Sequence, residues 1–324
     1  MIRVERKGTG GIGKMTGEKK NQKIGEVVLR FDHYTGTDTY DDGQVEDYLL
    51  QAVKDNNESE LEQVIASNPE WAVYYHLSPF RHNILNWYPF DKERTALEIG
   101  AGCGALTGLL SDACRQVTCV ELSERRSMIN AYRNSERSNI EIWISNFEDF
   151  ATYEKQKYDY ITLIGVLEYS ELYIHAREPQ TSFLEMIRAM LQPDGVVFIA
   201  IENKMGMKYW AGCKEDHFGK AYVGMEDYAG MTGIRTFSNV ELDRLLRGAG
   251  FSDNVFYYPY PDYKFPTAIY SDAYLPRYGM LTDNLRNLDM ERYRVFDEAK
   301  AFNNIIRDSM FPFFSNSYLV LAKA

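Results

Sequence analysis

The feature that most constrains this chain is an apolar segment that runs through closely spaced glycines into a helical pattern. Residues 95–110 read TALEIGAGCGALTGLL, in which Glu98, Gly100, Gly102 and Gly104 stand at alternate positions. Glycines allow a tight turn and a close approach of the backbone to a ligand. The N-terminus of the following helix offers unpaired N–H groups to a carboxylate or phosphate. The segment therefore predicts a ligand-binding loop between a strand and a helix.

Short apolar runs continue to alternate with amphipathic stretches toward the end of the chain. The further runs are QVTCVEL, SERRSMINAYRN, IEIWIS, YDYITLIG, SFLEMIRAML, GVVFIAIE, ELDRLLRGAG, NVFYYPY and SNSYLVLAKA. This order predicts a Rossmann-like, doubly wound α/β sheet. Two insertions interrupt it, at about 204–236 and about 267–314. Insertions beyond the carboxyl ends of strands usually build the acceptor site of an α/β enzyme.

The chain before this sheet has a different character. Residues 1–43 are expected to form an arm, a short strand (GEVVLRF) and a turn-rich loop. In residues 44–91 apolar side chains recur at three- and four-residue steps, which predicts a helical cap. Residues 92–324 then form the main domain with its two insertions. The first 30 residues carry 8 Lys and Arg against 3 Asp and Glu, a charge of +5, whereas the remainder carries −16.

Composition excludes several classes of protein. The 324 residues include 36 Lys and Arg against 47 Asp and Glu, a net charge of −11, which disfavours a nucleic-acid clamp. Apolar runs are strand-sized, far short of the roughly 18 residues of a membrane span. The N-terminus lacks the apolar region of a secretory signal. The four cysteines show no CxxC spacing and favour a reducing cytoplasm. We therefore expect a cytoplasmic protein.

Further predicted strands end in residues suited to a nucleoside. The strand QVTCVEL ends at Glu121, 17 positions after Gly104 (121 minus 104), and a carboxylate there can accept both ribose hydroxyls. The next strand leads into SNFEDF, where Asn146 and the backbone of Phe147 can meet an adenine edge. The strand after that ends in LIGVLEYS.

This combination resembles the class I S-adenosylmethionine-dependent methyltransferases, over about residues 81–251 and the final strand. The resemblance implies a seven-stranded sheet, S-adenosylmethionine as cofactor and S-adenosylhomocysteine as product. It implies that Glu98 and the loop glycines hold the methionine part, that Glu121 holds the ribose, and that Asn146 and Phe147 bracket the adenine. The cofactor-binding residues expected on this basis are Tyr75, Arg81, Glu98, Gly100, Ala101, Gly102, Gly104, Glu121, Leu122, Asn146, Phe147 and Gly165.

A dinucleotide-binding enzyme is the alternative for such a glycine-rich turn. The spacing G-x-G-x-G differs from the G-x-G-x-x-G of those enzymes, and Glu98 would repel a pyrophosphate. The chain also departs from the methyltransferase pattern at two places. Asn146 stands where the family more often has Asp, and Tyr169 stands where many members have His, so no base is available there. Cys103 in the loop is expected to be a small filler.

The residues upstream of the first strand suggest a further contact with the cofactor. Tyr75, His76 and Arg81 lie at a distance from it at which related enzymes fold a helix over the cofactor. Arg81 can pair with the methionine carboxylate. The alternative is that Arg81 only pairs with a surface acid and that His76 packs.

The acceptor side is expected after the fifth strand. Methyl transfer is an in-line displacement, so orientation and desolvation can supply most of the rate, although a base helps a hydroxyl acceptor. The polar groups at this place are Glu202, Asn203, Lys204, Glu215, Asp216 and His217. We take His217, with Asp216 and Glu202, as the candidate catalytic residues. The alternative for His217 is a solvated or structural side chain.

Two other patterns invite a ligand. Seven tyrosines between residues 257 and 278 suit a sugar or planar acceptor, although strand packing and a Pro-rich loop explain them equally. The DTYDDG loop invites a calcium reading, but Asp38, Asp42 and Gly43 lack the downstream Glu of an EF-hand. We therefore expect no metal site.

A closer resemblance comes from the phrases YYHLSPFRHNILNWYPF, ENKMGMKYWAGCKEDHFG, GIRTFS and YPYPDYKFPTAIYSD. They are similar to a bacterial branch of methyltransferases often found beside, or fused to, glycosyltransferases of cell-surface polysaccharide assembly. This implies O-methylation of a sugar, glycan or related small molecule, with a glycosyltransferase as a possible partner. The alternatives are a methyltransferase acting on a protein, RNA or natural product, and a non-catalytic cofactor-binding partner subunit. Net acidity disfavours RNA, although the +5 arm can contact phosphates.

Overall fold

A computed structural model describes residues 19–34, 36, 43–282 and 290–324. The chain forms two compact units, which are treated separately below. The first unit comprises Met1–Pro79 and Phe90–Lys155, and the second comprises Phe80–Pro89 and Gln156–Ala324. The division into arm, cap and main domain remains a prediction. In the described part of the chain, no helix is both long and apolar enough to cross a membrane.

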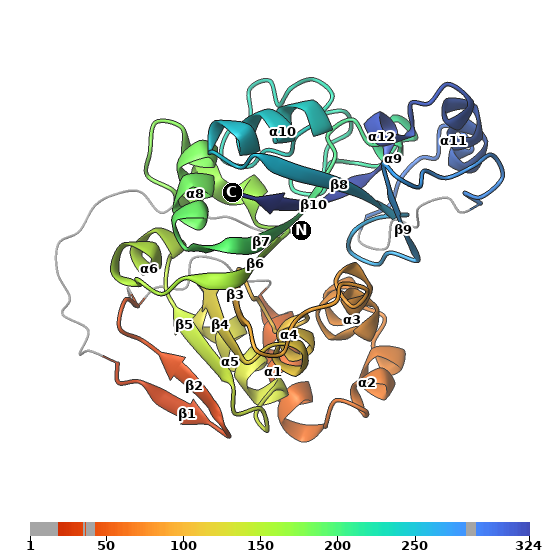
Figure 1. Ribbon diagram of the computed structural model, residues 1–324. Coiled ribbons are helices and arrows are strands. Elements are labelled where there is room, and N and C mark those ends of the chain that lie inside the picture. Colours follow the sequence, from red (N-terminus) through yellow and green to blue (C-terminus); the bar gives the residue numbers. More distant parts are fainter. Residues whose placement is uncertain (1–18, 35, 37–42, 283–289) are drawn as a thin grey trace. The chain divides into compact units, whose positions relative to one another are not determined.

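The strands of the first unit form a largely parallel sheet in the order β1-β2-β5-β4-β3 (Figure 1). Their bounds are β1 Gln22–Ile24, β2 Val27–Arg30, β3 Thr95–Ile99, β4 Gln116–Glu121 and β5 Ile140–Ile144. β2, β5, β4 and β3 pair in parallel, whereas β1 and β2 form an antiparallel hairpin. Every residue of β3 is buried. The carboxyl ends of β3, β4 and β5 therefore open toward one edge, where the predicted ligand loop begins.

Six helices are described in this unit. They are α1 Gln44–Asp55, α2 Leu61–Ser67, α3 Trp71–Leu77, α4 Thr107–Ala113, α5 Glu124–Arg133 and α6 Phe147–Tyr153. The side chain of Ser123 caps α5 by accepting a hydrogen bond from the N–H of Arg126. Arg126 in turn donates from Nε to Oε1 of Glu46 at 2.7 Å, and both side chains are buried. This ion pair fixes α1 against α5.

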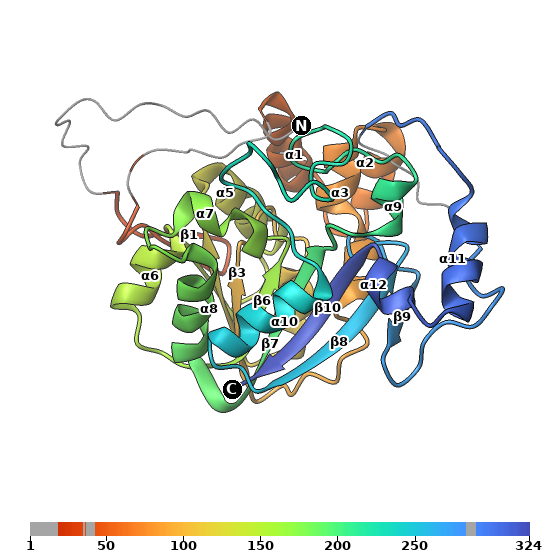
Figure 2. The same cartoon turned by 90° about the horizontal axis from the view of Figure 1, so that it is seen from above.

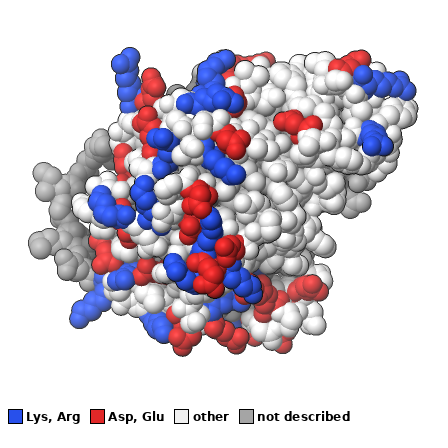
Figure 3. Space-filling model, viewed as in Figure 1, with Lys and Arg blue, Asp and Glu red and all other residues white. Residues whose placement is uncertain are grey.

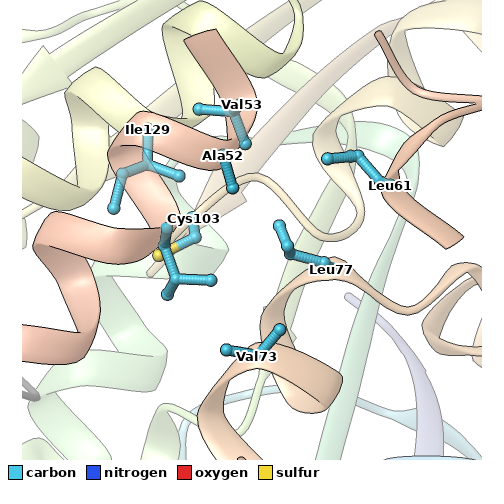
Figure 4. Packing of buried hydrophobic residues seen from close by; sticks show 8 residues of the cluster. Ala52, Val53, Leu61, Val73, Leu77, Cys103 and Ile129 are labelled. Atoms are coloured by element: carbon cyan, nitrogen blue, oxygen red, sulfur yellow. The ribbon is translucent and has the colours of Figure 1, made fainter. Parts of the chain in front are cut away.

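Helices α1 to α3, which occupy the predicted cap, share an apolar cluster with the glycine loop (Figure 4). The buried members of the cluster are Leu49, Ala52, Val53, Leu61, Val73, Leu77, Cys103 and Ile129. Cys103 belongs to the loop after β3, and Ile129 belongs to α5. The thiol is thus the apolar filler that the sequence suggests, and it connects the loop to α3. That these helices cover the cofactor remains a prediction.

The strands of the second unit have the order β6-β7-β10-β8-β9. Their bounds are β6 Tyr158–Ile164, β7 Leu191–Glu202, β8 Asp253–Tyr260, β9 Ala268–Ser271 and β10 Ser317–Lys323. Only β6 and β7 pair in parallel, and β10 runs antiparallel to both β7 and β8. The fully buried carboxyl half of β7 follows from the unbroken apolar run GVVFIAI.

The helices of the second unit are mostly short. They are η2 Leu167–Tyr169, α7 Ser170–Tyr173, α8 Pro179–Ala189, α9 Met207–Trp210, α10 Asn239–Gly248, α11 Glu298–Arg307 and α12 Phe311–Phe314. A further short helix, η1 Pro79–Ile84, lies in this unit except for its first residue, which belongs to the first unit. α8 and α10 lie side by side (Figure 2). Ser238 and Glu241 form a reciprocal capping box at the start of α10.

The Rossmann-like α/β fold is confirmed, but the number of strands exceeds the seven expected. Ten strands are described, five in each unit. The additional ones are β1, β2 and β9. β2 joins β5 because Val27 and Leu29 are buried on alternate positions, while β9 pairs with β8 inside the predicted second insertion. A four-residue strand inside a tyrosine-rich loop leaves little periodic signal to recognise.

Candidate functional site

The loop after β3 has the backbone that its glycines predict. Gly100, Gly102 and Gly104 have φ values of 71°, 52° and 77°, all in the left-handed region that L side chains rarely adopt. A Cβ on Gly104 would collide with the side chain of Asn130 in α5. A Cβ on Gly102 would meet no atom within 4 Å, so the loop borders open space at this residue. The loop is therefore packed on one side and able to receive a ligand on the other.

Glu98 lies at the end of β3 beneath the loop and is 5% exposed. Its Oε2 accepts hydrogen bonds from Oγ1 of Thr107 at 2.5 Å and from Sγ of Cys119 at 3.5 Å. Burial raises the pKa of this carboxyl to about 7, and the two hydrogen bonds only partly oppose that rise. At neutral pH the group is thus poised between its charged and neutral forms.

Glu121 occupies the end of β4 and braces the loop directly. Its Oε2 accepts from the N–H of Gly102 at 2.8 Å, and its Oε1 accepts from the N–H of Ser123 at 2.9 Å. Each carboxylate oxygen keeps a further lone pair, so the same group can still accept from a ribose hydroxyl. Leu122 follows it and is half-buried.

The end of β5 presents the third part of the predicted cofactor site. Asn146 caps α6 by accepting from the N–H of Glu148 at 3.2 Å, and Phe147 is buried. The side chain of Asn146, which is expected to contact the adenine, therefore also caps α6. Asn keeps this capping role as well as Asp does.

The first unit thus brings together the expected cofactor-binding residues of three strand ends. The fit to S-adenosylmethionine rests on the open space at Gly102 and on the carboxylate of Glu121 beside it. Tyr75 lies in α3 of the same unit, with its ring centroid 5.1 Å from that of His76. His76 is buried, as its packing alternative expects. The roles of all these residues toward the cofactor remain predictions.

Arg81 and Gly165 belong to the second unit. Arg81 is buried and donates from Nη1 to the carbonyl oxygen of Lys264 at 3.1 Å. Gly165 follows β6 with a φ of 71°, and a Cβ there would lie 2.7 Å from the hydroxyl oxygen of Tyr263. Only glycine fits this turn, which lies beside the charged groups described next.

A group of buried and half-buried charged side chains lies in the second unit and is here called the acceptor-side cluster. Its members come from η2, the end of β7, α9, the loop after α9 and the loop after β8. They are Glu168, Glu202, Lys208, Glu215, Asp216, His217, Asp262 and Lys264. Five carboxylates and two ammonium groups therefore surround one imidazole.

The imidazole of His217 is held between two carboxylates. Its Nδ1 lies 2.8 Å from Oε1 of Glu215, and its Nε2 lies 3.8 Å from Oε1 of Glu168. Burial lowers the pKa of His217, but the two carboxylates outweigh burial and raise this pKa well above its ordinary value. The ring of Tyr169 packs edge-on against the imidazole at 5.2 Å between centroids. An imidazole from a distant segment thus lies next to the position where many family members have His.

Asp216 is bound by cations and is a poor candidate for a base. Lys264 Nζ lies 2.9 Å from its Oδ1, Lys208 Nζ lies 3.1 Å from its Oδ2, and Tyr209 donates to Oδ2 at 2.6 Å. Burial raises the pKa of Asp216, but the two lysines outweigh it and lower this pKa well below its ordinary value. Lys264 also pairs with Glu202. Asp216 therefore acts here to hold the lysines in place.

The structure brings together four of the six candidate acceptor-side residues and separates the other two. The four residues that belong to the cluster are Glu202, Glu215, Asp216 and His217. Asn203 instead donates from Nδ2 to two backbone carbonyls, and Lys204 pairs with Asp227 and Glu241 away from the cluster. Sequence reasoning missed Glu168, Lys208, Asp262 and Lys264. Glu168 lies within the segment LIGVLEYS, just after β6, and could have been found there, whereas the others carry no local signal.

The tyrosine-rich segment divides into core and surface residues. Tyr258, Tyr260, Tyr263 and Tyr270 are buried, as the packing alternative predicts. Tyr274 and Tyr278 are exposed and remain available to a ligand. The acidic loop considered for calcium, with Asp38 and Asp42, lies outside the described residues. On the face drawn in Figure 3, Lys and Arg side chains are interspersed with Asp and Glu side chains.

Comparisons with known proteins agree with this geometry. The family model described as "Methyltransferase domain" matches residues 72–254, more than half of the chain. A ubiquinone biosynthesis O-methyltransferase from Hydrogenovibrio crunogenus is 23% identical over 141 residues, which cover 43% of this chain and 56% of that protein. The protein of the same name from Nitrosospira multiformis is 24% identical over 190 residues, which cover 56% of this chain and 73% of that protein.

The chain thus spans little more than half the length of the first of these relatives. A solved structure of a SAM-dependent methyltransferase from Archaeoglobus fulgidus has 14% identity and a TM-score of 0.46, and it covers 75% of this chain and 92% of that chain. Because this TM-score is low, the assignment rests on the family model. That match shows that the chain belongs to the methyltransferase-domain family and carries an S-adenosylmethionine-dependent methyltransferase domain.

Proposed function

We propose that the protein transfers a methyl group from S-adenosylmethionine to a hydroxyl oxygen of a sugar, a glycan precursor or a related small molecule. The bound cofactor supplies an electrophilic methyl group. The observation that carries the proposal is the place of His217 in the acceptor-side cluster. Its imidazole lies between Glu215 and Glu168, and Glu168 belongs to the turn after β6 that also contains Gly165.

The cluster has the groups that a hydroxyl acceptor needs. Glu168 and Glu202 offer carboxylate lone pairs next to His217, so one of the two carboxylates can take the hydroxyl proton as the oxygen–methyl bond forms. The raised pKa of His217 keeps its imidazole protonated, and this positive charge holds the two carboxylates in place. The ammonium groups of Lys208 and Lys264 can hold acceptor oxygens in place, because their carboxylate partners fix them. Because most of these side chains are buried, their polar contacts are shielded from water, which strengthens them.

Different observations support the two parts of this proposal, namely oxygen as the methylated atom and a sugar as the acceptor. Both curated relatives bear the name O-methyltransferase, which favours oxygen. The sugar, and a glycosyltransferase as partner, draw on the resemblance of the acceptor-side phrases to the polysaccharide-associated branch. The exposed Tyr274 and Tyr278 suit a sugar face. The protein, RNA and natural-product alternatives predict other acceptors, and a partner subunit predicts cofactor binding without turnover.

The test is transfer of a labelled methyl group to a panel of acceptors: sugar nucleotides and oligosaccharides, phenols, peptides and RNA. We expect label in the sugar arm as an alkali-stable ether. His217→Ala should leave cofactor binding nearly unchanged but slow the transfer, because His217 is not among the residues expected to hold the cofactor. Label only in another arm would replace the sugar, and cofactor binding with no transfer in any arm would favour the partner subunit. Unaltered turnover in His217→Ala would remove His217 from the reaction.

A further inference from the structure

We propose that Glu168, Glu202 and His217 form a binding site for a divalent metal ion. One ligand atom from each of the three side chains lies within 4.8 Å of the others. Two carboxylates and one imidazole suit Mn²⁺, Zn²⁺, Co²⁺ or Fe²⁺ better than an ion that prefers only oxygen. This site differs from the acidic loop at residues 38–43, for which the sequence pattern does not support a calcium site.

The first independent observation is that two carboxylate oxygens of the site have no hydrogen-bond partner. Oε2 of Glu168 and Oε2 of Glu202 are both buried and unpaired among the described residues. The residues are 2% and 1% exposed, so bulk water does not reach them. A buried charged acceptor without a partner is costly. A metal ion would satisfy both oxygens at once.

The second observation is the orientation of the imidazole. Oε2 of Glu215 accepts hydrogen bonds from the backbone N–H groups of His217 and Phe218, each at 2.8 Å. Its Oε1 lies 2.8 Å from Nδ1 of the His217 imidazole, within hydrogen-bond distance. The proton on Nδ1 is thus held by Glu215, and a metal ion that displaces the other proton would bind the lone pair on Nε2. Nε2 lies 3.8 Å from Glu168, which is longer than a hydrogen bond. A carboxylate that orients a histidine by its other nitrogen is the usual support of a metal ligand.

The third observation is charge. The acceptor-side cluster contains five carboxylates and two ammonium groups. This is a formal excess of two negative charges with His217 protonated (5 minus 3), and of three with His217 neutral (5 minus 2). Lys264 pairs with Oε1 of Glu202 and leaves Oε2 open. Because burying unbalanced charge is unfavourable, a divalent cation would stabilise this arrangement.

Modest movements would close the site. The ligands of a tetrahedral ion lie about 3.4 Å apart, given bonds of about 2.1 Å. Because the ligand atoms lie within 4.8 Å of one another, they would draw together by at most about 1.4 Å. An ion with three protein ligands keeps open positions for water or another oxygen. That this oxygen belongs to the methyl acceptor rests on the proposed function, whereas binding of the ion does not.

The test is calorimetric titration of MnCl₂, and separately ZnCl₂, into the full chain after treatment with chelator. We expect one ion to bind per chain. Binding should be weaker by a factor of about 10 to 100 or more in Glu168→Gln, Glu202→Gln and Glu215→Gln, because even groups that only orient a metal ligand have effects of this size. Glu226→Gln is the matched control, because Glu226 is an exposed acid of the same unit. It should bind as the parent does.

A second readout guards against variants that fail to fold. The visible absorption of bound Co²⁺ should show a nitrogen ligand in the parent chain and lose that signature in His217→Asn, while circular dichroism confirms the fold. No binding to the parent chain, or equal binding in all variants, would overturn the site and leave an ion-pair cluster only. The titration contains neither cofactor nor acceptor, so it tests the metal site independently of methyl transfer. If the protein binds one ion but transfers no methyl group, the metal site stands and the proposed function does not. If it transfers a methyl group but binds no ion, the metal site is refuted and the proposed function stands.

Discussion

The raised pKa of Glu98 makes the stability of the chain depend on pH in a defined way. Its carboxyl titrates at about 7 when folded, against an ordinary value of 4.5. At about 1.4 kcal/mol for each tenfold change, the folded state gains about 3 kcal/mol from the neutral form relative to the ionised one. Because the folded pKa is raised, this contribution is fully present below pH 4.5 and is lost as pH rises through 7.

The variant Glu98→Gln tests this, because the amide has the same shape, still accepts from Thr107 and cannot ionise. We expect the free energy of unfolding of the parent chain to fall by about 2.5 kcal/mol more than that of the variant between pH 5 and pH 8. The measurement is urea denaturation at several pH values without cofactor. Other titrating groups cancel in the difference between the two chains.

Glu62→Gln is the control, since Glu62 is an exposed acid on α2 of the same unit. Its unfolding free energy should follow the parent chain at every pH. Parallel pH profiles for the parent chain and Glu98→Gln would refute the assignment of a buried, poised carboxyl beneath the glycine loop.

Further predictions concern the cofactor site, the core and the acceptor side. Glu121→Ala removes one hydrogen bond to the backbone of the glycine loop and one to the backbone of Ser123, and it should weaken S-adenosylhomocysteine binding about tenfold to a hundredfold by calorimetry. Glu46→Ala leaves the buried guanidinium of Arg126 without its paired carboxylate and should lower the free energy of unfolding by about 3–5 kcal/mol in urea denaturation. A loss near zero would show that the pair is not buried in solution. Ser238→Ala breaks the capping box of α10 and should cost about 1 kcal/mol. His217→Ala should slow methyl transfer by about 10²–10⁴-fold, measured as single-turnover rate with labelled cofactor.

The parts of the site that could be predicted are those in which chemistry and sequence position coincide. Gly100, Gly102 and Gly104 are recognisable because a positive φ leaves glycine as the favoured residue, and the structure has positive φ at all three. Glu121 is recognisable because it ends a strand next to this loop. Its contact with the N–H of Gly102 was not expected, since a backbone partner leaves no trace in the pattern.

The acceptor side could be predicted only in part, because its members meet through the fold. Asp216 and His217 drew attention as neighbours, yet Lys264 and Glu168, which also contact them, lie far along the chain. Lys208 comes from a four-residue helix and Lys264 from a loop after β8, and neither position carries a periodic or turn signal. Glu168 is within reach of His217 only because the turn after β6 and the loop after α9 converge. Such convergence depends on tertiary packing and has no local code.

Calorimetric titration of S-adenosylhomocysteine into the purified chain tests the central claim most directly, namely that the loop after β3 holds the cofactor. We expect micromolar binding that is lost in Gly102→Arg, whose side chain would fill the open space beside Glu121. Gly230→Arg is the matched control, because Gly230 also has a positive φ and open space but lies in the second unit. It should bind as the parent chain does. Equal heats in Gly102→Arg and the parent chain, or no heat from the folded parent chain, would contradict the account.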